Sequence, residues 1–325
     1  MTMSYSNIQI LKMKHHVTLF KALIFLLFIS CHNEPVGMMP VDVLEEDISI
    51  NDPKKTGCNV GSCVGDVESP KLLDSILPNL NLPQNFDLSS LMPPVRSQGG
   101  QGSCVSFATT YYLKSYQEKV QNKYDFITYD DVMSPAFVYN FSKPVGDCGL
   151  GSCIENALYV LKTKGTNTWS EFPYDPFNCN KKPNVALMES ALKHRISKSY
   201  KVNSFVKDNQ NYKFLDIAKT LIHQGNPIII AIKIDRNFVD NLPKKTDNLY
   251  VYEKYDFEKN YGNHAMLIVG YNDELKAFKV VNSWGTEWGD KGYCWISYDF
   301  FREPTDLKFQ LGILGAYIAY DKPNI

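Results

Sequence analysis

Three side chains in this sequence could together perform nucleophilic catalysis: Cys104 as the nucleophile, His264 as the acid–base group and Asn282 as the group that orients His264. Cys104 follows the turn-rich run Gln98-Gly99-Gly100-Gln101-Gly102-Ser103 and opens a helix that we expect to extend to about Gln121. A cysteine in the first turn of a helix lies at the positive end of the helix dipole, which favours the thiolate over the thiol. Cys104 is therefore a candidate nucleophile.

The local sequence around Cys104 does not decide the matter alone. The tripeptide Gly-Ser-Cys occurs three times, ending at Cys63, Cys104 and Cys153. An isolated Gly-Ser-Cys is more often a buried or disulfide-linked cysteine, so the groups that would meet Cys104 in the fold must be considered.

His264 and Asn282 are placed to meet each other in a β-hairpin. The run from 262 to 271 and the run from 279 to 285 read as strands, with a turn near Glu274 between them. Opposite positions in such a hairpin have residue numbers that add to about 548, so His264 and Asn282 share one face of the sheet within a diagonal of each other. An imidazole oriented by an amide is what a cysteine nucleophile needs as its acid–base partner. The alternative is that His264 is a structural polar residue.

The elements around these residues indicate an α+β protein. Helices are predicted over residues 104–121, 154–164, 187–196 and 212–224, and strands over residues 227–234, 249–252, 264–271, 278–283 and 293–298. Because the helices come mostly before position 225 and the strands mostly after it, we expect a helical half and a β half with a cleft between them.

Several motifs in chain order resemble those of the papain-like cysteine peptidases (clan CA, family C1). The motifs are Gln98, Gly102-Ser103-Cys104 with Phe107-Ala108, His264-Ala265, and Asn282-Ser283-Trp284-Gly285 with Trp288-Gly289 and Gly292-Tyr293. The resemblance covers residues 83–325 and implies a two-subdomain fold, with a helical N-terminal half and an antiparallel β-barrel-like C-terminal half. His264 follows Cys104 by 160 residues, beyond the family's span of about 130–150, which we attribute to a loop insertion around 244–260.

The resemblance implies a role for each residue of the catalytic site. Cys104 attacks the peptide carbonyl as a thiolate paired with protonated His264, and Asn282 orients His264. Trp284 shields the His264–Asn282 hydrogen bond from water. The side-chain amide of Gln98 and the backbone N–H of Cys104 form the oxyanion hole. No cofactor and no metal is implied.

Substrate-binding positions follow from the same alignment. Gly151 and Ser152 fall where a Gly-Gly pair of the family meets the extended substrate backbone. Ile154 and Ala231 are candidates to line an S2-like subsite for an apolar residue, although both could be core residues, which for Ala231 is the simpler interpretation.

The sequence also departs from the family's usual pattern. Gln101 and Val105 replace a cysteine and a tryptophan that usually flank the nucleophile, so one common disulfide is absent. No long helical propeptide precedes the domain, since only residues 32–82 are available as a linker or short pro-segment. These features resemble the bacterial branch of the family.

The first 31 residues have the composition of a signal peptide. Basic residues precede the apolar run Ala22–Ile29, which ends at Ser30-Cys31. Ending on Cys31, the run resembles a bacterial lipobox, so we expect a lipid on Cys31 and an exported protein anchored in the bacterial cell envelope. The alternative is an ordinary signal peptide and a secreted protein. No apolar run reaches the roughly 20 residues that span a bilayer.

The eight cysteines favour an oxidising compartment. Once Cys31 and Cys104 are set aside, six remain, and six allow 15 connectivities. We favour Cys148 or Cys153 paired with Cys179. A zinc site is disfavoured because no nearby ligands complete either Cys-x4-Cys spacing.

The remaining function classes are narrowed by charge and by motif. A formal net charge of −1 gives no electrostatic basis for nucleic-acid binding. We expect a monomer that acts on peptide or protein substrates. The alternatives are an inactive binding protein on the same fold, and a transglutaminase or amidase that uses Cys and His for acyl transfer.

Overall fold

The structure is a computed structural model, and it describes residues 55–60, 71–73, 78, 81–203, 205–207, 210–240, 249–301 and 312–322. The predicted signal peptide with Cys31, most of the predicted linker, and Cys63 lie outside the described residues. Within the described part of the chain, no helix has the length and apolar character needed to cross a membrane.

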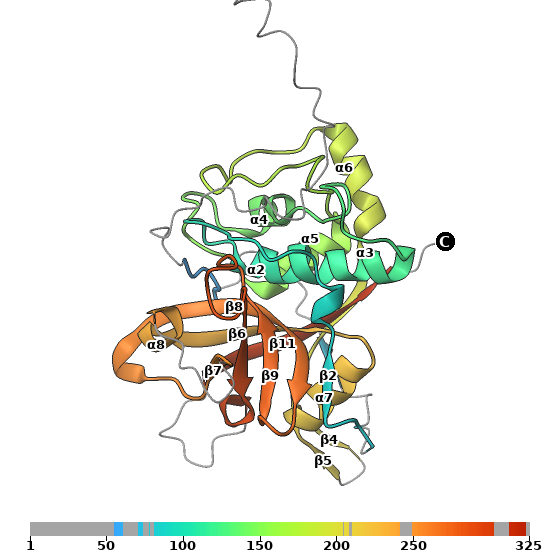
Figure 1. Ribbon diagram of the computed structural model, residues 1–325. Coiled ribbons are helices and arrows are strands. Elements are labelled where there is room, and N and C mark those ends of the chain that lie inside the picture. The colour runs from blue at the N-terminus through green and yellow to red at the C-terminus, as the bar shows by residue number, and fades with distance from the viewer. Residues whose placement is uncertain are drawn as a thin grey trace, which may run out of the picture. The chain divides into compact units, whose positions relative to one another are not determined.

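Helices dominate the first part of the domain. Their bounds are α2 (Cys104–Ser106), η2 (Phe107–Lys114), α3 (Ser115–Asn122), α4 (Pro135–Ser142), α5 (Ile154–Thr163), α6 (Val185–Ala191) and η3 (Leu192–His194), preceded by the short η1 (Ser89–Leu91). The elements α2, η2 and α3 follow one another without a break, which confirms the predicted long helix that begins at Cys104. Figure 1 shows these helices on one side of the sheet.

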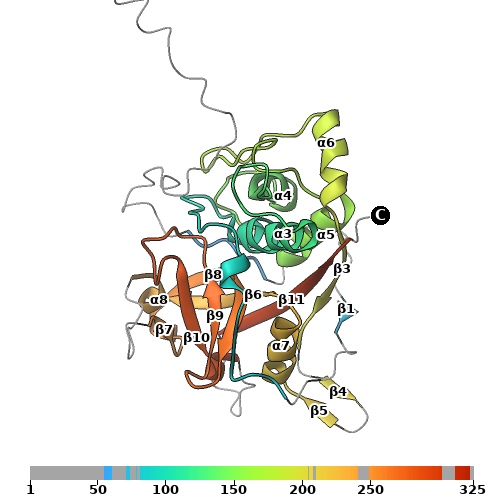
Figure 2. The same cartoon turned by 45° about the vertical axis from the view of Figure 1, so that its right-hand side comes forward.

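Strands and further helices form the second part. The sheet order is β1 (Lys71–Leu72), β3 (Ile196–Lys201), β11 (Ile313–Asp321), β6 (Ile228–Asp235), β8 (Asn260–Asn272), β9 (Ala277–Val281), β10 (Tyr293–Ser297) and β7 (Val251–Tyr252), with β2 (Asn85–Asp87) also on β8. Apart from this sheet, β4 (Phe205–Lys207) pairs with β5 (Gln210–Tyr212), and the remaining elements are α7 (Phe214–His223), α8 (Arg236–Asp240), η5 (Phe257–Lys259) and η6 (Tyr298–Phe301). The predicted α+β architecture is confirmed, and Figure 2 shows α7 beside the sheet, away from helices α2 to α6. The sheet is mixed rather than purely antiparallel, because β1 pairs with β3, and β7 with β10, in parallel.

Strand β6 explains why the sheet carries helices on both faces. Its sequence is a run of isoleucines, and every residue from Ile228 to Asp235 except Lys233 is buried. It lies between β11 and β8 and packs against both η2 and α7. A strand covered on both faces needs a continuous apolar run instead of the alternation that suits a half-exposed strand.

The hairpin of β8 and β9 has the predicted register. Leu267 pairs with Val281, so their numbers add to 548, and the sum rises to 549 after a bulge that follows Ile268. Because the register near the open end of the hairpin is the predicted one, His264 on β8 and Asn282 just after β9 come into contact.

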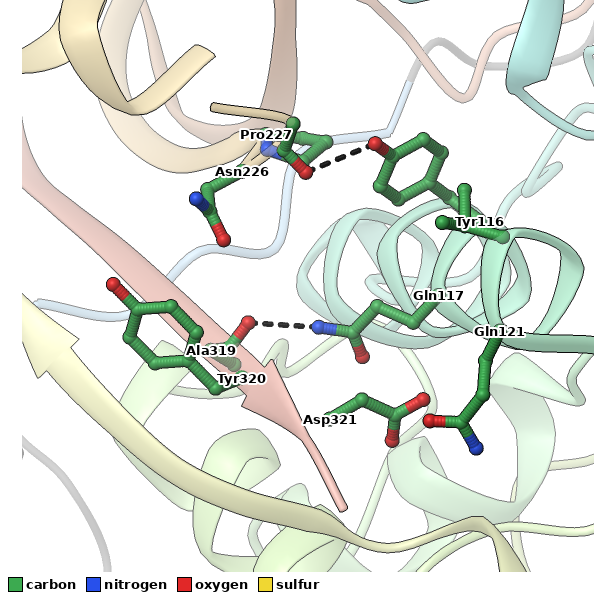
Figure 3. Close-up of a pocket in the computed structure, with 10 residues that line it drawn as sticks. Tyr116, Gln117, Gln121, Asn226, Pro227, Ala319, Tyr320 and Asp321 are labelled. Atoms are coloured by element: carbon green, nitrogen blue, oxygen red, sulfur yellow. Dashed lines mark hydrogen bonds between the residues drawn. The ribbon is translucent and has the colours of Figure 1, made fainter. Parts of the chain in front are cut away.

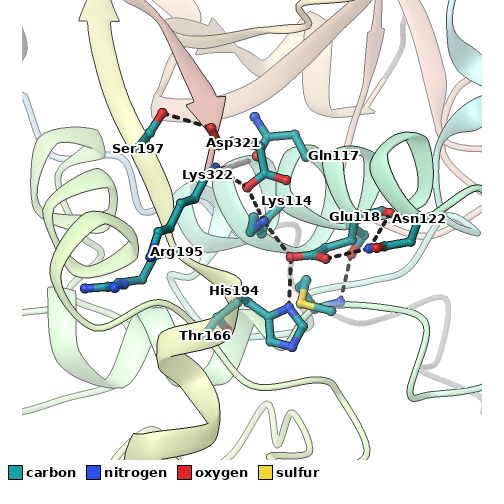
Figure 4. A network of polar contacts seen from close by, with 12 residues as sticks. Lys114, Gln117, Glu118, Asn122, Thr166, His194, Arg195, Ser197, Asp321 and Lys322 are labelled. Atoms are coloured by element: carbon teal, nitrogen blue, oxygen red, sulfur yellow. Dashed lines mark hydrogen bonds and ion pairs between the residues drawn. The ribbon is translucent and has the colours of Figure 1, made fainter. Parts of the chain in front are cut away.

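A buried charge network fastens the long helix to the last strand. The Lys114 side chain is 1% exposed, and its ammonium group lies 2.6 Å from carboxylate oxygens of both Glu118 and Asp321. Nδ1 of His194 lies 2.8 Å from Glu118, and Asn122 donates to the same carboxylate. Figure 4 shows this network where the helix, η3 and the end of β11 meet.

A hollow of about 320 Å³ lies next to this network, between α3, the turn at 225–227 and the end of β11. Tyr116 donates to the carbonyl of Gly225 at 2.9 Å, and Gln117 donates to the carbonyl of Ala319 at 2.7 Å. Figure 3 shows both hydrogen bonds spanning the hollow. The two contacts hold α3 against the β part of the domain.

One disulfide joins the loops of the helical part. Cys148 and Cys179 are bonded, which confirms the first of the two pairings favoured above. Cys58, Cys104, Cys153 and Cys294 are buried and take no part in this disulfide. In the described residues, no three His, Cys, Asp or Glu side chains group together in a way that could hold a metal ion.

Candidate active site

Cys104 lies at the start of the long helix, at the boundary with the sheet. The turn that leads into the helix is tight, because a Cβ at Gly102 would lie 2.8 Å from the backbone nitrogen of Gly151. Ser103 hydrogen-bonds Tyr174 at 2.7 Å, and its carbonyl accepts the N–H of Phe107. These contacts fix the helix start, and the Cys104 side chain there is fully buried.

His264 and Asn282 form the pair that the hairpin register predicts. Nε2 of His264 lies 2.7 Å from Oδ1 of Asn282, and Oδ1 also accepts the backbone N–H of Ser283 at 2.7 Å. Because an amide oxygen only accepts, the imidazole proton is on Nε2. Nδ1 of His264 has no hydrogen-bond partner within the described residues. It is therefore an unprotonated acceptor, free to take a proton from a neighbouring group.

Trp284 covers this pair. Its ring stacks on the His264 imidazole with centroids 4.4 Å apart and planes 29° apart. His264 and Asn282 are 0% and 1% exposed. The hydrogen bond between them is thus kept from water, as expected for Trp284 from the sequence.

Gln98 is buried beside the same loop, and its amide orientation is fixed by Ser283. The Ser283 hydroxyl donates to Oε1 of Gln98 at 2.6 Å, and the Gln98 backbone N–H donates to the Ser283 carbonyl at 2.9 Å. With Oε1 occupied as an acceptor, Nε2 is directed the other way, where it donates to the carbonyls of Lys55 and Gln101 at 3.1 and 2.8 Å. Gln98 thus offers an N–H donor at this boundary.

Residues Lys55–Val60, which we call the covering segment, lie across this group of side chains. The Lys55 carbonyl accepts from Nε2 of Gln98 and from Nε1 of Trp284, each at 3.1 Å. Farther along, the Cys58 N–H donates to the Asn263 carbonyl at 3.3 Å. Figures 1 and 2 show the segment in blue at the boundary between the helices and the sheet.

The covering segment pairs with Ser152 as a parallel strand would. The Ser152 N–H donates to the Gly57 carbonyl at 2.8 Å, and the Asn59 N–H donates to the Ser152 carbonyl at 3.0 Å. Cys58 is the residue opposite Ser152. In parallel pairing, the backbone of one residue bonds the residues before and after its partner, as Ser152 bonds Gly57 and Asn59 on either side of Cys58. In antiparallel pairing, two opposite residues exchange both hydrogen bonds with each other.

Gly57 is packed so closely over the site that only glycine fits. A Cβ at Gly57 would lie 2.2 Å from the Gly102 carbonyl oxygen. Gly151 has φ of +76°, and a Cβ there would lie 2.2 Å from the Gly57 oxygen. The Gly57 N–H faces the Cys104 thiol, since this backbone group lowers the thiol's pKa as a donor does.

Burial under the covering segment sets the ionisation of the catalytic pair. Burial raises the pKa of the Cys104 thiol to about 12, and backbone donors of Ala265, Val105 and Gly57 lower it by less. Burial lowers the pKa of His264 to about 4, against its hydrogen bond to Asn282. Position at a helix start favoured a thiolate, but in the covered site the loss of water outweighs that effect, so both groups are neutral near pH 7.

The structure brings together most of the residues that the sequence singled out. Cys104, His264, Asn282, Gln98 and Trp284 lie at one boundary, and Gly151 and Ser152 line the path of the covering segment. Ile154 and Ala231 are buried.

Three contributions were missed by sequence reasoning. Tyr112 donates to the Asn282 carbonyl at 2.8 Å, and Ser283 orients Gln98. The sequence predicts a linker or short pro-segment over residues 32–82 but not its path across the site, because Lys-Thr-Gly-Cys-Asn-Val has no periodicity. Only Ser283 carried a signal, since it lies inside the Asn-Ser-Trp-Gly motif.

Comparison with known proteins identifies the family. A family model described as "Papain family cysteine protease" matches residues 82–303. The chain belongs to this family. Members with 26–27% identity include a peptidase C1-like protein of Acanthamoeba polyphaga mimivirus, cysteine proteinase 3 of Entamoeba histolytica and a cathepsin L-like proteinase of Fasciola hepatica.

These alignments cover 72%, 67% and 66% of this chain, and 72%, 63% and 60% of the respective relatives. The chain therefore matches less than two thirds of the amoebal and fluke proteins. Their viral, amoebal and animal origins do not support the predicted bacterial branch of the papain family.

Solved structures of papain-family enzymes share the fold. Xylellain, a cysteine protease from Xylella fastidiosa, matches with a TM-score of 0.63 at 22% identity, over 83% of this chain and 97% of that one. A procathepsin L2 from the larval midgut of Tenebrio molitor matches with a TM-score of 0.58 at 18% identity, over 98% and 95% of the two chains. The two-part papain-like fold predicted from the motifs is thus confirmed.

Proposed function

We propose that this protein is a cysteine peptidase in which Cys104 is the nucleophile and His264 its acid–base partner. The observation that carries the proposal is the fixed tautomer of His264. Because Nε2 donates to Asn282 at 2.7 Å, Nδ1 is the acceptor. The Cys104 thiol interacts with the backbone of Ala265, the residue that follows His264 on β8. A thiol, an accepting imidazole nitrogen and an orienting amide form a nucleophilic acyl-transfer site.

The reaction uses Cys104, His264, Gln98 and a water molecule. Cys104 transfers its proton to Nδ1 of His264, and its sulfur bonds to the carbonyl carbon of the substrate. The negative charge that develops on the carbonyl oxygen is stabilised by the Cys104 N–H and by Nε2 of Gln98. The C–N bond then breaks as His264 protonates the leaving amine, which leaves a thioester on Cys104. Water, deprotonated by His264, hydrolyses the thioester and restores the thiol.

We extend the proposal to the control of activity: the covering segment is the pro-segment. It occupies Nε2 of Gln98, Nε1 of Trp284 and both backbone groups of Ser152. It also presents the Gly57 N–H to the Cys104 thiol. Displacement of residues 55–60 would expose Cys104 and return its pKa, and that of His264, toward the values of solvated groups.

The test of peptidase action uses the full chain with Gly57→Arg, whose side chain would collide with the Gly102 carbonyl and displace the covering segment, and it separates the alternatives. Hydrolysis of a denatured protein substrate, lost in Cys104→Ala, supports the peptidase. Incorporation of a primary amine into a glutamine substrate without hydrolysis would favour an acyltransferase, and neither reaction in a folded, reduced protein would favour a binding protein on this fold. The presence of Cys104, His264, Asn282 and Gln98 together favours the enzyme.

We also propose that Cys31 carries a lipid that anchors the exported, monomeric protein to a membrane, with secretion as the alternative. The basis is the apolar run before Ser30-Cys31. The intact mass of the protein purified from membranes tests this. A mass that corresponds to a diacylglyceryl-modified Cys31 is the expected result, and an unmodified protein found only in the medium would contradict it.

A further inference from the structure

The covering segment shows where a side chain enters the site beside Ser152. Cys58 is the residue opposite Ser152, and its side chain is enclosed, with 3% of the residue exposed. A substrate strand that paired with Ser152 in the antiparallel direction would also place one residue where Cys58 lies. In both parallel and antiparallel pairing, one residue of the added strand lies directly opposite Ser152. The space that holds Cys58 is therefore a side-chain subsite, which we call the Cys58 subsite.

The floor of this subsite is a row of very small residues. Ala265, Ala231 and Gly315 are direct neighbours across β8, β6 and β11. Neighbours in register share a face of the sheet. Cys58 lies beside the β8 end of the row, because its N–H bonds the carbonyl of Asn263, two residues before Ala265.

Tyr317 closes the other end of the row. It follows Gly315 by two residues on β11 and so shares its face, and a Cβ at Gly315 would lie 2.9 Å from the Tyr317 ring. The ring thus fills the space that the glycine leaves. The residue is 4% exposed, and its hydroxyl donates to the carboxylate of Glu155 in the first turn of α5.

The tyrosine–glutamate contact makes this wall resistant to displacement. Hydrogen bonds to charged groups are among the strong ones in proteins, and separating Tyr317 from Glu155 would leave a partly buried carboxylate without this donor. A bulky side chain such as phenylalanine could enter only if the ring moved away. A side chain the size of cysteine, alanine, serine or valine needs no such movement.

We propose that the Cys58 subsite selects small side chains, with Tyr317, held by Glu155, as the residue that sets the limit. The proposal rests on the proposed function, since it names the substrate class of that site. The substrates are polypeptides with a small uncharged residue at the position opposite Ser152.

The first experiment reads the subsite without catalysis. The full chain is reduced and alkylated with iodoacetamide at pH 8, and modification of Cys104 is followed by peptide mass mapping. Cys58→Ala should leave the covering segment in place and the rate unchanged. Cys58→Phe should be excluded by Tyr317, which displaces the segment and accelerates alkylation by about tenfold or more. Thermal unfolding of each variant confirms that it is folded.

The double variant provides the specific control. In Cys58→Phe with Tyr317→Ala, the enlarged subsite should accept the phenylalanine and slow the alkylation again, an effect that general destabilisation would not produce. Cys58→Phe with Tyr317→Phe, which keeps the ring but loses the bond to Glu155, should be alkylated at a rate between those of Cys58→Phe alone and of the double variant with Tyr317→Ala. Slow alkylation in Cys58→Phe with Tyr317 intact would overturn the proposal.

The second experiment measures selectivity during turnover. In the uncovered Gly57→Arg chain, peptides that differ only in the residue opposite Ser152 should be cleaved with a kcat/KM about tenfold or more higher for alanine or valine than for phenylalanine, and an added Tyr317→Ala should reverse that order. A wild-type preference for phenylalanine would overturn the small-residue limit. If the alkylation pattern holds while no peptide is cleaved, the peptidase proposal fails and the size limit of the subsite stands.

Discussion

Oδ1 of Asn282 accepts two hydrogen bonds, from Nε2 of His264 and from the backbone N–H of Ser283, each at 2.7 Å. The second bond identifies Oδ1 as the amide oxygen and so fixes which nitrogen of His264 carries the proton. Tyr112 holds the same asparagine by its carbonyl. Asn282 is therefore a positioning residue whose own orientation is set from both sides.

Replacement of Asn282 by alanine should lower kcat by about 10- to 1,000-fold, because His264 then loses its orientation and its preferred tautomer. KM should change little, since Asn282 is buried away from the substrate path. Steady-state kinetics with active-site titration checks this. A kcat that stays within twofold of wild type would contradict the positioning role.

Gln98→Ala should lower kcat by about 100- to 1,000-fold, the usual effect of removing one oxyanion donor. Gln98→Glu is the matched variant, because it keeps the size and the acceptor for Ser283 but removes the Nε2–H. Both variants should lose activity equally at constant KM. If Gln98→Glu keeps wild-type kcat, another group supplies the donor.

Ionisation of the covered site predicts how pH displaces the covering segment. The pKa of His264 is lowered from 6.5 to about 4, so the covered state is favoured above pH 6.5 and loses that advantage as pH falls toward 4. The Cys104 pKa, raised from 9.0 to about 12, favours the covered state below pH 9. The reagent 2,2′-dipyridyl disulfide reacts with thiols in acid as well as at neutral pH. The rate at which Cys104 reacts with it should rise at least about tenfold as the pH is lowered from 7 to 4.5.

Gly57→Arg provides the control for that pH profile. Its side chain would collide with the Gly102 carbonyl, so the segment should leave and Cys104 should react rapidly at both pH values. The same acid-dependent increase in Gly57→Arg as in wild type would show that the rise does not come from uncovering.

Lys114→Met should destabilise the domain by about 3–5 kcal/mol, because Glu118 and Asp321 would share a buried region without their cation. The expected fall in Tm is about 6–20 °C. Lys259→Met, which removes an exposed ion pair to Asp256, should change stability far less, because water screens that pair. Equal effects from the two substitutions would contradict the importance of the buried network.

The same network predicts a loss of stability in strong acid. Burial opposes ionisation of Glu118, but His194 and Lys114 outweigh it and hold its pKa at about 2. A lowered carboxyl pKa contributes stability above the ordinary value of 4.5 that is lost as pH falls toward about 2. The acid midpoint of unfolding should therefore move to higher pH in Glu118→Gln, which removes this ionisation.

The sequence predicted those elements whose local pattern matched their surroundings. The long helix from Cys104 and the β8–β9 register followed from periodicity and turn position. Helix α4 was missed because Pro135–Ser142 is apolar on nearly all sides, so it shows no helical alternation. Strands β3 and β11 were missed as well, and their place in the sheet depends on pairing with β6 and with each other.

Among the site residues, the motifs predicted which side chains meet but not what covers them. The covering segment takes its conformation from Ser152, Gln98 and Trp284, and not from its own propensities. Its glycine is required by a collision with Gly102, which lies 45 residues away in the sequence. Contacts of this kind are not encoded in local spacing.

Activation of Cys104 by His264 can be tested by the reaction of Cys104 with an epoxysuccinyl peptide inhibitor in the Gly57→Arg chain, followed by intact mass. We expect a single adduct, absent from the matched Cys104→Ala chain and formed at least about 100-fold more slowly when His264 is replaced by alanine. No adduct in a folded, reduced chain, or an adduct formed equally fast without His264, would contradict an activated Cys104–His264 pair.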